Sequence, residues 1–539
     1  MPTTPAIQRG ATARMFESDF FEFFSKVHPA VPGLLFAPVA AWFLWQGAQT
    51  APVLDAALAV AFGVAAWTLL EYSLHRFLFH VPPEGPVRRW INWTFHGVHH
   101  QFPDDPRRLV MVPSVSVPLA LLFHATIFAL APAALAPSVF AGIVLGYLWY
   151  DYSHWATHYW KPPQHPLLRP LARAMRAQRA RHMRHHFGDP EADYGVSVGL
   201  WDFVFDTGAG ERSAPAWFDR LTRDLVRDER DTFVAWTVAS LAVRAMTPAV
   251  LLFAFDAPWW VCAASMAFTL TSSTDRYTLM LHVVSHRPLF RKQIGWLNHF
   301  VPAILGPFYG QTPFSYYVHH VGMHHAEGNL EDDLSTTMPF DGDRFSHWLR
   351  YAGRFFFLAP VDLGRYLLRK KQHKLLALML KGELTWLLVV ASLALWRPVP
   401  TLFVFVLPVV ILRVAMMQGN WAQHAFVDLS DPANPYRNSV DLVASPHNRR
   451  CFNDGYHIVH HRRPLMHWTE MAAEHASHRD DYAANDAMVF RDVPNFIVLW
   501  KWLMAKDYDR MAEHFVDYRG GRSKEEIVEV IRSRVRRAS

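Results

Sequence analysis

Apolar stretches long enough to cross a bilayer as helices recur along the chain in pairs. A helix of about 20 residues spans the roughly 30 Å of hydrocarbon. The first half contains four such stretches, at 31–49, 53–72, 112–131 and 135–152. After a polar, charge-rich segment the second half repeats them at 233–255, 259–281, 384–397 and 399–418, the seventh being short. This pattern predicts an all-α integral membrane fold of two tandem helical units, each with about four transmembrane helices and a cytoplasmic cap.

Three further segments are expected to lie outside the bilayer core. The apolar segments 300–310 and 354–368 are too short to span, and we expect them to be interfacial or re-entrant. The basic tail from Gly520 could form an amphipathic helix on the membrane surface or a solvated one, and we expect it to be solvated.

The distribution of basic residues predicts the orientation. The tight connections within the four predicted hairpins contain one basic residue, Arg397. The opposite side carries the arginine-rich run 169–184 and the basic run from Arg369 to Lys374. By the positive-inside rule that side is cytoplasmic. The histidine clusters described below lie on it, so the active sites of a multi-pass membrane protein are expected at the cytoplasmic face.

Composition agrees with a membrane protein and narrows the chemistry. Of the 539 residues 51% are hydrophobic and only 19% are charged, which is apolar for a soluble enzyme. The net charge of +6 is spread through loops rather than gathered on an aromatic-laced patch, so we expect no nucleic-acid partner. The two cysteines, Cys262 and Cys451, make neither a disulfide framework nor a Cys-x-x-Cys motif. Any metal must therefore be held by nitrogen and oxygen ligands.

Most of the 31 histidines fall in short boxes at the ends of predicted spans. On a helix, residues three and four apart share a face, so His-x3-His and His-x2-His-His are expected to aim two or three imidazoles at one point. His75 and His80 are five apart, about 140° around an ideal helix, so we expect them to serve two adjacent ions. The boxes of the first half contain His75, His80, His96, His99, His100, His154, His158, His182, His185 and His186.

The second half contains similar histidine boxes. Eight or more imidazoles exceed what one four- to six-coordinate ion can take, so two ions are expected in each half. Chance alone would produce one such box in a histidine-rich chain, but not several at matching membrane depth. The core set is His282, His286, His320, His324, His325, His457, His460 and His461, with His319 and His424 in reserve.

Residues outside the boxes are given weaker roles. Lone histidines such as His28, His124, His165, His373 and His514 are most often surface or packing residues, and we exclude them from metal binding. Ligand imidazoles need carboxylate or carbonyl partners that orient them. By proximity in sequence the candidate carboxylates are Glu71, Asp151, Asp193, Asp333 and Asp428.

The first half resembles the fatty acid 2-hydroxylase branch of the sterol desaturase and fatty acid hydroxylase superfamily. The resemblance follows HGVHHQFPDDPRRLVMVP, GYLWYDYSHWATHYW and HHFGDPEADYGVSVGLWDFVFDTG along roughly residues 60–208. It implies that the ten imidazoles of this half hold a dimetal centre, and that the reaction is O₂-dependent hydroxylation next to a lipid acyl carbonyl. The HPGG haem-binding motif of fungal and animal members is absent from the sequence, so no fused cytochrome b5 is expected and an external electron donor is implied.

The second half resembles membrane fatty acyl desaturases over about 233–510, most clearly at FNDGYHIVHHRRPLMHW (452–468). Asn420 and His424 match an Asn-x3-His of the acyl-CoA desaturases, which implies that His424 is a further ligand and that Asn420 acts through water. Val283 stands where many desaturases have an acidic residue. Desaturation, acyl hydroxylation and alkane-type oxidation therefore stay open for this half.

Together these resemblances predict a bifunctional membrane lipid oxidase, with fatty acyl 2-hydroxylation in the first half and fatty acyl desaturation in the second. The expected cofactors are O₂ and two dimetal centres, with non-haem iron favoured and zinc an alternative in the first. The expected partners are a lipid or acyl substrate, the membrane, and a redox partner such as a cytochrome b5-like protein, a ferredoxin or a reductase. The alternatives are one active half with the other structural, or a histidine-rich metal transporter, which would place histidines at the bilayer midplane.

The expected boundaries follow from these assignments. We expect an N-terminal cytoplasmic segment at 1–30, a hydroxylase-like domain at 31–215, a linker at 216–232, a desaturase-like domain at 233–510 and a basic tail at 511–539. The first 26 residues are polar and mixed in charge, without the apolar core of a cleavable signal. The first span is therefore expected to direct the chain to the membrane.

Overall fold

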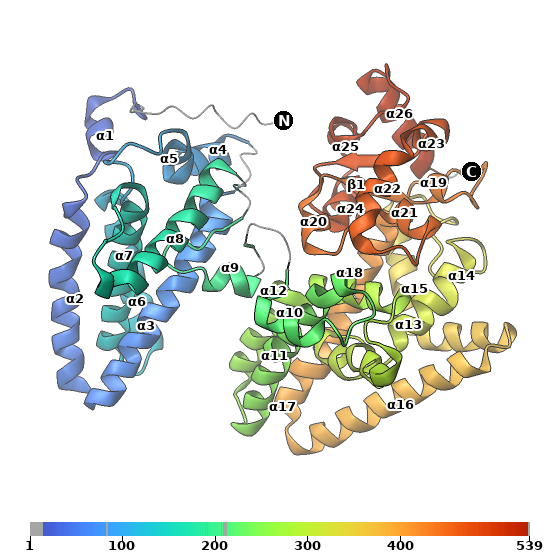
Figure 1. The fold of residues 1–539 in the computed structure, drawn as a ribbon, viewed down its shortest axis with the longest axis horizontal. Coiled ribbons are helices and arrows are strands. Elements are labelled where there is room, and N and C mark those ends of the chain that lie inside the picture. Colours follow the sequence, from blue (N-terminus) through green and yellow to red (C-terminus); the bar gives the residue numbers. More distant parts are fainter. Residues whose placement is uncertain are drawn as a thin grey trace. The chain divides into compact units, whose positions relative to one another are not determined.

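The computed structural model describes residues 14–81, 85–188, 190, 192–205, 207–208 and 213–536. The chain divides into two compact units, Met1–Glu211 and Arg212–Ser539 (Figure 1). Both units are helical. In the described part of the chain the only strands are β1 (Val440–Val443) and β2 (Met488–Arg491), which pair in parallel with Val440 opposite Met488.

The first unit is built around four long helices. The helices α2 (Ala30–Thr50), α3 (Val53–Ser73) and α6 (Pro113–Leu130) each pack on α7 (Ala136–Tyr159), and α8 (Arg169–Phe187) contacts the end of α7 (Figure 1). The shorter elements are α1 (Asp19–Phe24), the π-helices η1 (Leu74–Phe79) and η2 (Trp93–Gly97), α4 (Gly85–Asn92), α5 (Val98–Gln101), the 3₁₀ turn η3 (Pro166–Leu168) and α9 (Leu200–Phe205).

Helices α3 and α7 touch backbone to backbone. A Cβ atom built on Gly63 would lie 2.3 Å from the Val139 carbonyl oxygen and 2.9 Å from the Cα of Gly142. Small residues allow such close approach between membrane helices, where dispersion contacts rather than the hydrophobic effect drive packing. This contact holds together the two helices whose ends carry His75, His154 and the neighbouring boxes.

The second unit is larger and adds a cap of short elements to its long helices. Its long helices are α11 (Thr232–Ala254), α12 (Trp259–His286), α15 (Phe345–Arg369), α16 (His373–Trp396) and α18 (Leu407–His424). Its short elements are α10 (Ala216–Thr222), η4 (Glu229–Asp231), η5 (Lys292–His299), η6 (Phe300–Leu305), η7 (Gly306–Tyr309), α13 (Ser315–His319), η8 (His320–His324), α14 (His325–Glu327), α17 (Pro398–Thr401), η9 (Leu402–Val406), α19 (Pro435–Asn438), α20 (Pro446–Arg450), α21 (His457–Arg462), η10 (Trp468–Glu470), α22 (Met471–Ser477), α23 (Arg479–Ala484), α24 (Phe496–Met504), α25 (Tyr508–His514) and α26 (Lys524–Val535).

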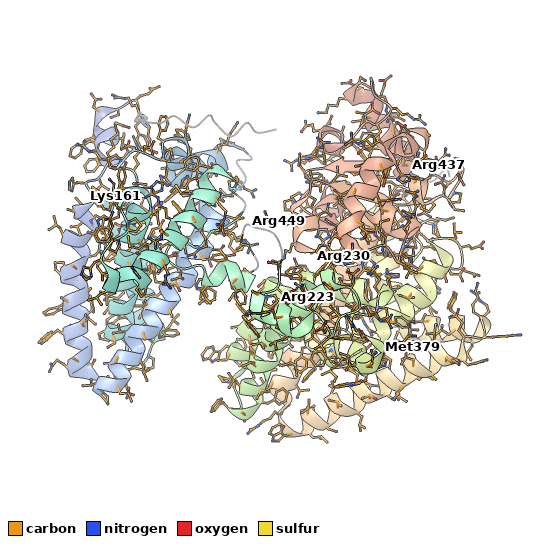
Figure 2. The ribbon with its side chains drawn as sticks, in the orientation of Figure 1. Lys161, Arg223, Arg230, Met379, Arg437 and Arg449 are labelled. Carbon is orange, nitrogen blue, oxygen red and sulfur yellow. The ribbon has the colours of Figure 1, made fainter. Side chains whose placement is uncertain are left out.

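Two apolar clusters connect the cap of this unit to its helices. Trp421 of α18 is fully buried in a cluster with Phe490 of β2 and Leu499 of α24. Met379 of α16, labelled in Figure 2, packs in another cluster with Val318 of α13. Because α13 and α18 each lead directly into a histidine box, this packing fixes the positions of the boxes.

Six helices in the described part are long and apolar enough to cross a membrane: Ala30–Thr50, Val53–Phe79, Pro113–Leu130, Glu229–Ala254, His373–Trp396 and Pro398–His424. The spans predicted at 135–152 and 259–281 form the helices α7 and α12. Both are long enough to cross a membrane, but they are not apolar enough to belong to this set. The predicted short seventh span is instead a full-length helix, because it begins at His373. These helices make the chain a multi-pass membrane protein.

The expectation of a solvated C-terminal tail is wrong. Helix α26 buries Ile527, Val528, Ile531 and Val535 in the cluster around Trp421. These apolar residues recur one and four positions apart, which places them on a single face of the helix. Lys524 and Arg532 are exposed, whereas Arg534 is buried and pairs with Asp428. The charged residues are at least as numerous as the apolar ones in this helix, which concealed the apolar stripe.

The segment 354–368 is not a separate short element. It is the larger part of α15, a 25-residue helix with Trp348 and Leu367 buried and Phe357 exposed. The segment 300–310 is irregular, with the π-helix η6 followed by the 3₁₀ turn η7. An interfacial location for either segment stays a prediction.

Candidate metal centres

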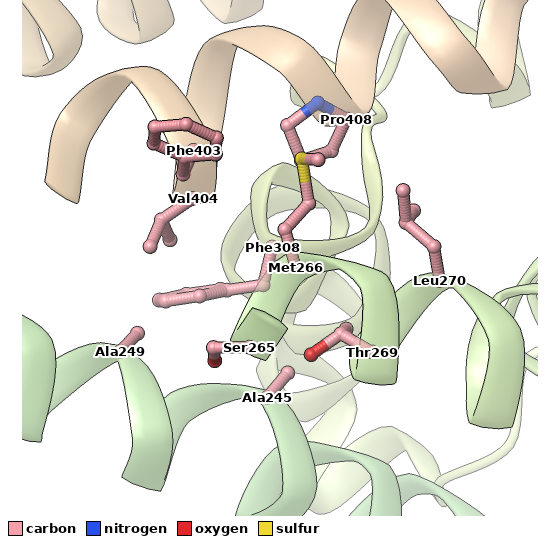
Figure 3. Close-up of a pocket in the computed structure, with 10 residues that line it drawn as sticks. All are labelled: Ala245, Ala249, Ser265, Met266, Thr269, Leu270, Phe308, Phe403, Val404 and Pro408. Atoms are coloured by element: carbon pink, nitrogen blue, oxygen red, sulfur yellow. The ribbon is translucent and has the colours of Figure 1, made fainter. Parts of the chain in front are cut away.

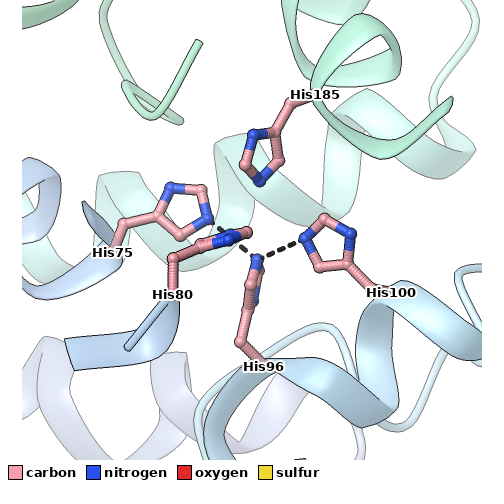
Figure 4. Close-up of side chains that lie close together, drawn as sticks. All are labelled: His75, His80, His96, His100 and His185. Carbon is pink, nitrogen blue, oxygen red and sulfur yellow. Dashed lines mark hydrogen bonds between the residues drawn. The ribbon is translucent and has the colours of Figure 1, made fainter. Parts of the chain in front are cut away.

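All ten histidines predicted in the first unit come together, in two groups of five. Within each group the ligand nitrogens lie within 4.8 Å of one another. Figure 4 shows the first group, in which rings from three separate segments of the chain point at a common centre. The first group is His75, His80, His96, His100 and His185, and the second is His99, His154, His158, His182 and His186.

His75 and His80 occur in the same group, so the prediction that they serve two different ions is wrong. The chain between them forms the π-helix η1, and the amide of His80 donates to the carbonyl of His75 across five residues, at 3.1 Å. A π-turn is wider than an α-turn, so residues five apart lie above one another. The 140° separation assumed for a regular α-helix therefore does not apply.

A single box also supplies both groups. His182 and His186 lie in one group while His185 lies in the other, and the box around His99 divides in the same way. Adjacent helical residues are separated by about 100°. Of the two or three imidazoles expected at one point, each of these two boxes brings two, the rings four residues apart, into one group and places the third in the neighbouring group. Such a box bridges two sites, which fits a pair of neighbouring ions.

The second unit repeats this arrangement. His282, His286, His320, His325 and His460 form one group, and His324, His424 and His461 form another. His457 adjoins the second group, with its Nε2 3.2 Å from that of His424 and 3.1 Å from that of His461. His424, held in reserve by sequence, is thus part of a site. His319 joins neither group, and its ring packs against Phe355.

The nitrogen geometry fits metal coordination rather than hydrogen bonding. The Nδ1 of His75 donates to the carbonyl of Tyr194 at 2.6 Å and that of His154 to the carbonyl of Leu109 at 2.9 Å, which leaves each neutral ring an unprotonated Nε2. Two such atoms repel, yet the Nε2 of His75 is 2.8 Å from that of His96. Two ligands held about 2.1 Å from one ion at right angles are about 3.0 Å apart.

Burial keeps these imidazoles neutral. Burial, followed by repulsion from neighbouring imidazoles, lowers the pKa of His99, His182 and His460 well below the usual value. The Nε2 atoms of His80 and His286 are buried without any hydrogen-bond partner in the described chain. Neutral, converging and unpartnered imidazole nitrogens are the donor set expected for divalent transition metals.

Two stretches of the chain match known protein families. Residues 60–207 match the fatty acid hydroxylase family model. A dihydroceramide fatty acyl 2-hydroxylase of Arabidopsis thaliana is 38% identical over 205 residues, which cover 37% of this chain and 82% of that protein. The chain belongs to the fatty acid hydroxylase family. Residues 257–492 match the fatty acid desaturase family model, so a desaturase-like unit follows the hydroxylase unit.

Two further comparisons concern the same part of this fatty acid hydroxylase. A ceramide very long chain fatty acid hydroxylase of Saccharomyces cerevisiae is 35% identical over 195 residues, 36% of this chain and 48% of that protein. A solved structure of full-length scs7p, with only its hydroxylase domain visible, is 34% identical and covers 37% of this chain and 74% of that chain, with a TM-score of 0.34. Hydroxylases and desaturases are oxidoreductases, and this chain is an oxidoreductase of lipid metabolism.

The carboxylates that orient the imidazoles of the desaturase-like unit are Asp333 and Asp454. Asp333 accepts from Nδ1 of His324 at 2.7 Å, as its place in the sequence predicted. Asp454 accepts from Nδ1 of His282 at 2.8 Å and was not predicted, although it stands three residues before His457 in the third box. Proximity in sequence would have paired Asp454 with a histidine of its own box. Its partner is instead His282, 172 positions away.

The other four predicted carboxylates accept hydrogen bonds from groups that are not ligand rings. Glu71 accepts from the Ser197 amide, Asp151 from the Met111 amide, Asp193 from Arg184, and Asp428 from Ser430. In the hydroxylase unit backbone carbonyls take over this role, with the carbonyl of Ala192 accepting from Nδ1 of His185 at 2.7 Å. No sequence pattern marks a carbonyl that acts in this way.

Asp454→Asn tests this positioning role. The amide keeps the shape but loses the charge that holds His282, so we expect the metal content of the desaturase-like unit and its product to fall by about 10- to 100-fold. Elemental analysis and lipid mass spectrometry measure the two effects. Asp332→Asn removes a surface carboxylate paired with Arg369 and Lys370 and is the matched control. Equal behaviour of the two variants would contradict the assignment.

An apolar cavity of about 340 Å³ leads away from the ligands of the desaturase-like unit. Its wall on α12 follows one helical face in steps of four, through His282, Thr278, Thr274 and Leu270. Asn420 of α18 also lines it, and its side-chain amide donates to the hydroxyl of Tyr351 at 2.6 Å and to the carbonyl of Ser335 at 3.2 Å. A water bridge from Asn420 to a metal stays a prediction.

A second, smaller cavity lies beside Leu270 (Figure 3). It has a volume of about 20 Å³ and lies between α11, α12 and the start of α18, with Ala249, Met266 and Phe308 in its wall. Leu270 lines both cavities and forms part of the partition between them. From His282 to Leu270 helix α12 rises about 18 Å. The larger cavity can therefore hold an extended hydrocarbon chain that ends at Leu270.

Proposed function

We propose that the chain is a bifunctional lipid oxidase, in which the hydroxylase unit adds a hydroxyl at carbon 2 of a lipid acyl chain and the desaturase-like unit introduces a double bond into an acyl chain. One observation carries the proposal: each unit has its own complete set of buried imidazoles, divided into two adjacent groups. A single activity would leave one such set without use. The relatives named as fatty acyl 2-hydroxylases support carbon 2 as the atom that the first unit hydroxylates.

The proposed cofactor of each unit is a pair of non-haem iron ions, for which the two imidazole groups provide separate binding sites. Bound iron would supply the activation of O₂ and the abstraction of hydrogen from an unactivated C–H bond. The residues of the protein position the ligand rings and the substrate, and they exclude water. The Nδ1 bonds fix the ring directions, and the apolar cavity of the desaturase-like unit keeps water from the hydrocarbon chain and holds it extended.

The orientation and the electron supply belong to the same proposal. The arginine-rich run 169–184 lies in α8, the helix that also carries His182, His185 and His186, and the basic run 369–374 lies where α15 ends and α16 begins. Both runs support active sites on the cytoplasmic face. Each oxidation consumes two electrons, which the residues of the sites do not provide. An external redox protein is therefore the proposed electron donor for both units.

Comparative lipid mass spectrometry of cells with and without the gene tests the proposal. We expect two new classes of lipid, one heavier by one oxygen and one lighter by two hydrogens. We also expect the purified chain to carry four iron ions, since there are four imidazole groups. Metal uptake by the cells without any O₂-dependent change in lipids would instead support a transporter and contradict an oxidase.

Leu270 is expected to limit the chain length accepted by the desaturase-like unit. Leu270→Ala joins the two cavities, and each additional buried CH₂ contributes about 0.8 kcal/mol, so the preference for a substrate two carbons longer should rise about tenfold. Competition between saturated substrates of different lengths, read out by mass spectrometry, measures this ratio. Leu251→Ala, at an exposed position of α11, is the control. An unchanged ratio for Leu270→Ala would show that the chain does not reach the partition.

A further inference from the structure

Helix α8 of the hydroxylase unit has two opposite faces of very different character. One face carries His182, His185 and His186, which are buried in the two imidazole groups. Its nineteen residues also include six arginines and no acidic residue. Arg169, Arg173 and Arg176 are exposed, and among the described residues none of the three has an acidic partner.

The three arginines form a stripe. At 100° per residue they lie within about 60° of one another, and their mean direction is about 150° from that of the three imidazoles. Arg184 extends the stripe toward the C-terminal end of the helix, where it pairs with Asp193. We call Arg169, Arg173 and Arg176 the arginine face.

We propose that the arginine face is the docking surface for the electron donor of the hydroxylase unit, a protein with an acidic surface around its redox group. The inference rests on the proposed function, because hydroxylation requires a donor. In that reaction one C–H bond becomes C–OH while one O₂, two electrons and two protons are consumed and one water is released. The two electrons must come from outside the chain.

Two observations favour this position. The arginine face is centred about 12 residues before the three imidazoles, which is about 18 Å along α8, and a helix with its side chains is about 10–12 Å thick, so a protein docked there lies roughly 20 Å from the imidazole groups. Uncompensated charges of one sign also attract and orient a partner of the opposite sign and raise its association rate. The same helix thus joins a charged outer surface to ligands of both groups.

The arginine face is better suited to a protein than to a lipid surface. A helix that binds a bilayer presents an apolar face to it. The exposed large apolar residues of α8, Leu171 and Phe187, are 50% and 45% exposed and lie near opposite ends of the helix on opposite sides of it, so they form no continuous apolar face for a bilayer. Lys161, near the start of the connection to α8 and labelled in Figure 2, adds a further exposed cation to this unit.

The test uses the full chain in membrane discs, with a reduced cytochrome b5-type haem domain of acidic surface as donor. The variant Arg169→Gln/Arg173→Gln/Arg176→Gln is compared with Arg350→Gln/Arg365→Gln/Lys374→Gln, which removes three exposed cations from the desaturase-like unit. We expect the donor concentration for half-maximal hydroxylation to rise about tenfold in the first variant only. We also expect its salt dependence to weaken, while the maximal rate stays within about twofold.

Dithionite as electron source separates the possible outcomes. Product from dithionite at the wild-type level, together with a weakened response to the haem domain, supports the proposal. No hydroxylated product from the wild-type chain with either source would overturn the proposed function itself. The three single variants are measured alongside, so a triple variant that fails to fold still leaves a result. An unchanged donor dependence, or a change confined to binding of anionic vesicles, would overturn the docking surface.

Discussion

His185→Ala is expected to abolish the hydroxylated lipid and to leave the desaturated lipid unchanged, and His460→Ala is expected to do the reverse. His185 belongs to one imidazole group of the hydroxylase unit, and His460 approaches the Nε2 atoms of both His282 and His325, at 2.7 and 2.8 Å. Loss of a residue that only orients a ligand costs about 10- to 100-fold. Loss of a ligand itself should cost at least about 100-fold in product, measured by lipid mass spectrometry.

His165→Ala and His373→Ala are the controls, because both histidines are exposed and neither belongs to an imidazole group. Metal analysis of the same samples should show a loss confined to one unit in each ligand variant. If both ligand variants lost one shared product, and no product were lost by only one of them, two independent activities would be excluded. The chain would then be a single-activity oxidase with one supporting unit.

Gly63→Val is expected to prevent the folding of the hydroxylase unit. The new Cβ would lie 2.3 Å from the Val139 carbonyl and 2.9 Å from the Cα of Gly142, and backbone atoms cannot move away as a side chain can. Overpacking of a tight core costs about 1–3 kcal/mol, and a backbone clash costs at least as much. Helices α3 and α7 would separate. His75 and His154 would then move away from the other imidazoles of their groups.

Thermal unfolding in detergent and the yield of hydroxylated lipid measure this effect. Ala65→Val is the matched control, since it adds the same β-branched side chain to an exposed position of the same helix. The desaturated lipid should persist in both variants, because the desaturase-like unit has its own core. Normal hydroxylation by Gly63→Val would show that α3 and α7 do not need their close contact.

The imidazoles could be identified from the sequence because spacing carries the information. His-x3-His and His-x2-His-His recur at the ends of apolar stretches, and all the histidines named from these boxes, apart from the reserve residue His319, lie in or beside one of the four groups. The grouping itself could not be predicted, because it depends on helix type. A π-turn between His75 and His80 reverses the geometry expected for an α-helix, and no residue pattern in LHRFLF marks it.

The residues that orient the ligands required the tertiary structure. Asp454 reaches His282 across 172 positions, and the hydroxylase unit uses carbonyls such as those of Tyr194 and Ala192. Every residue has a carbonyl, so its selection depends on folding. The tail helix α26 is a similar case, because its composition indicated solvent while the apolar stripe through Ile527 and Ile531 required a partner around Trp421.

By itself the sequence determined that this is a helical membrane protein with two histidine sets, because hydrophobic length and imidazole spacing are local properties of the chain. The tertiary structure alone decided which imidazoles face one another, which carboxylates and carbonyls hold them, and where the cavity ends at Leu270. Those features join residues far apart in the chain. Their positions follow from the packing of whole helices, which no local pattern specifies.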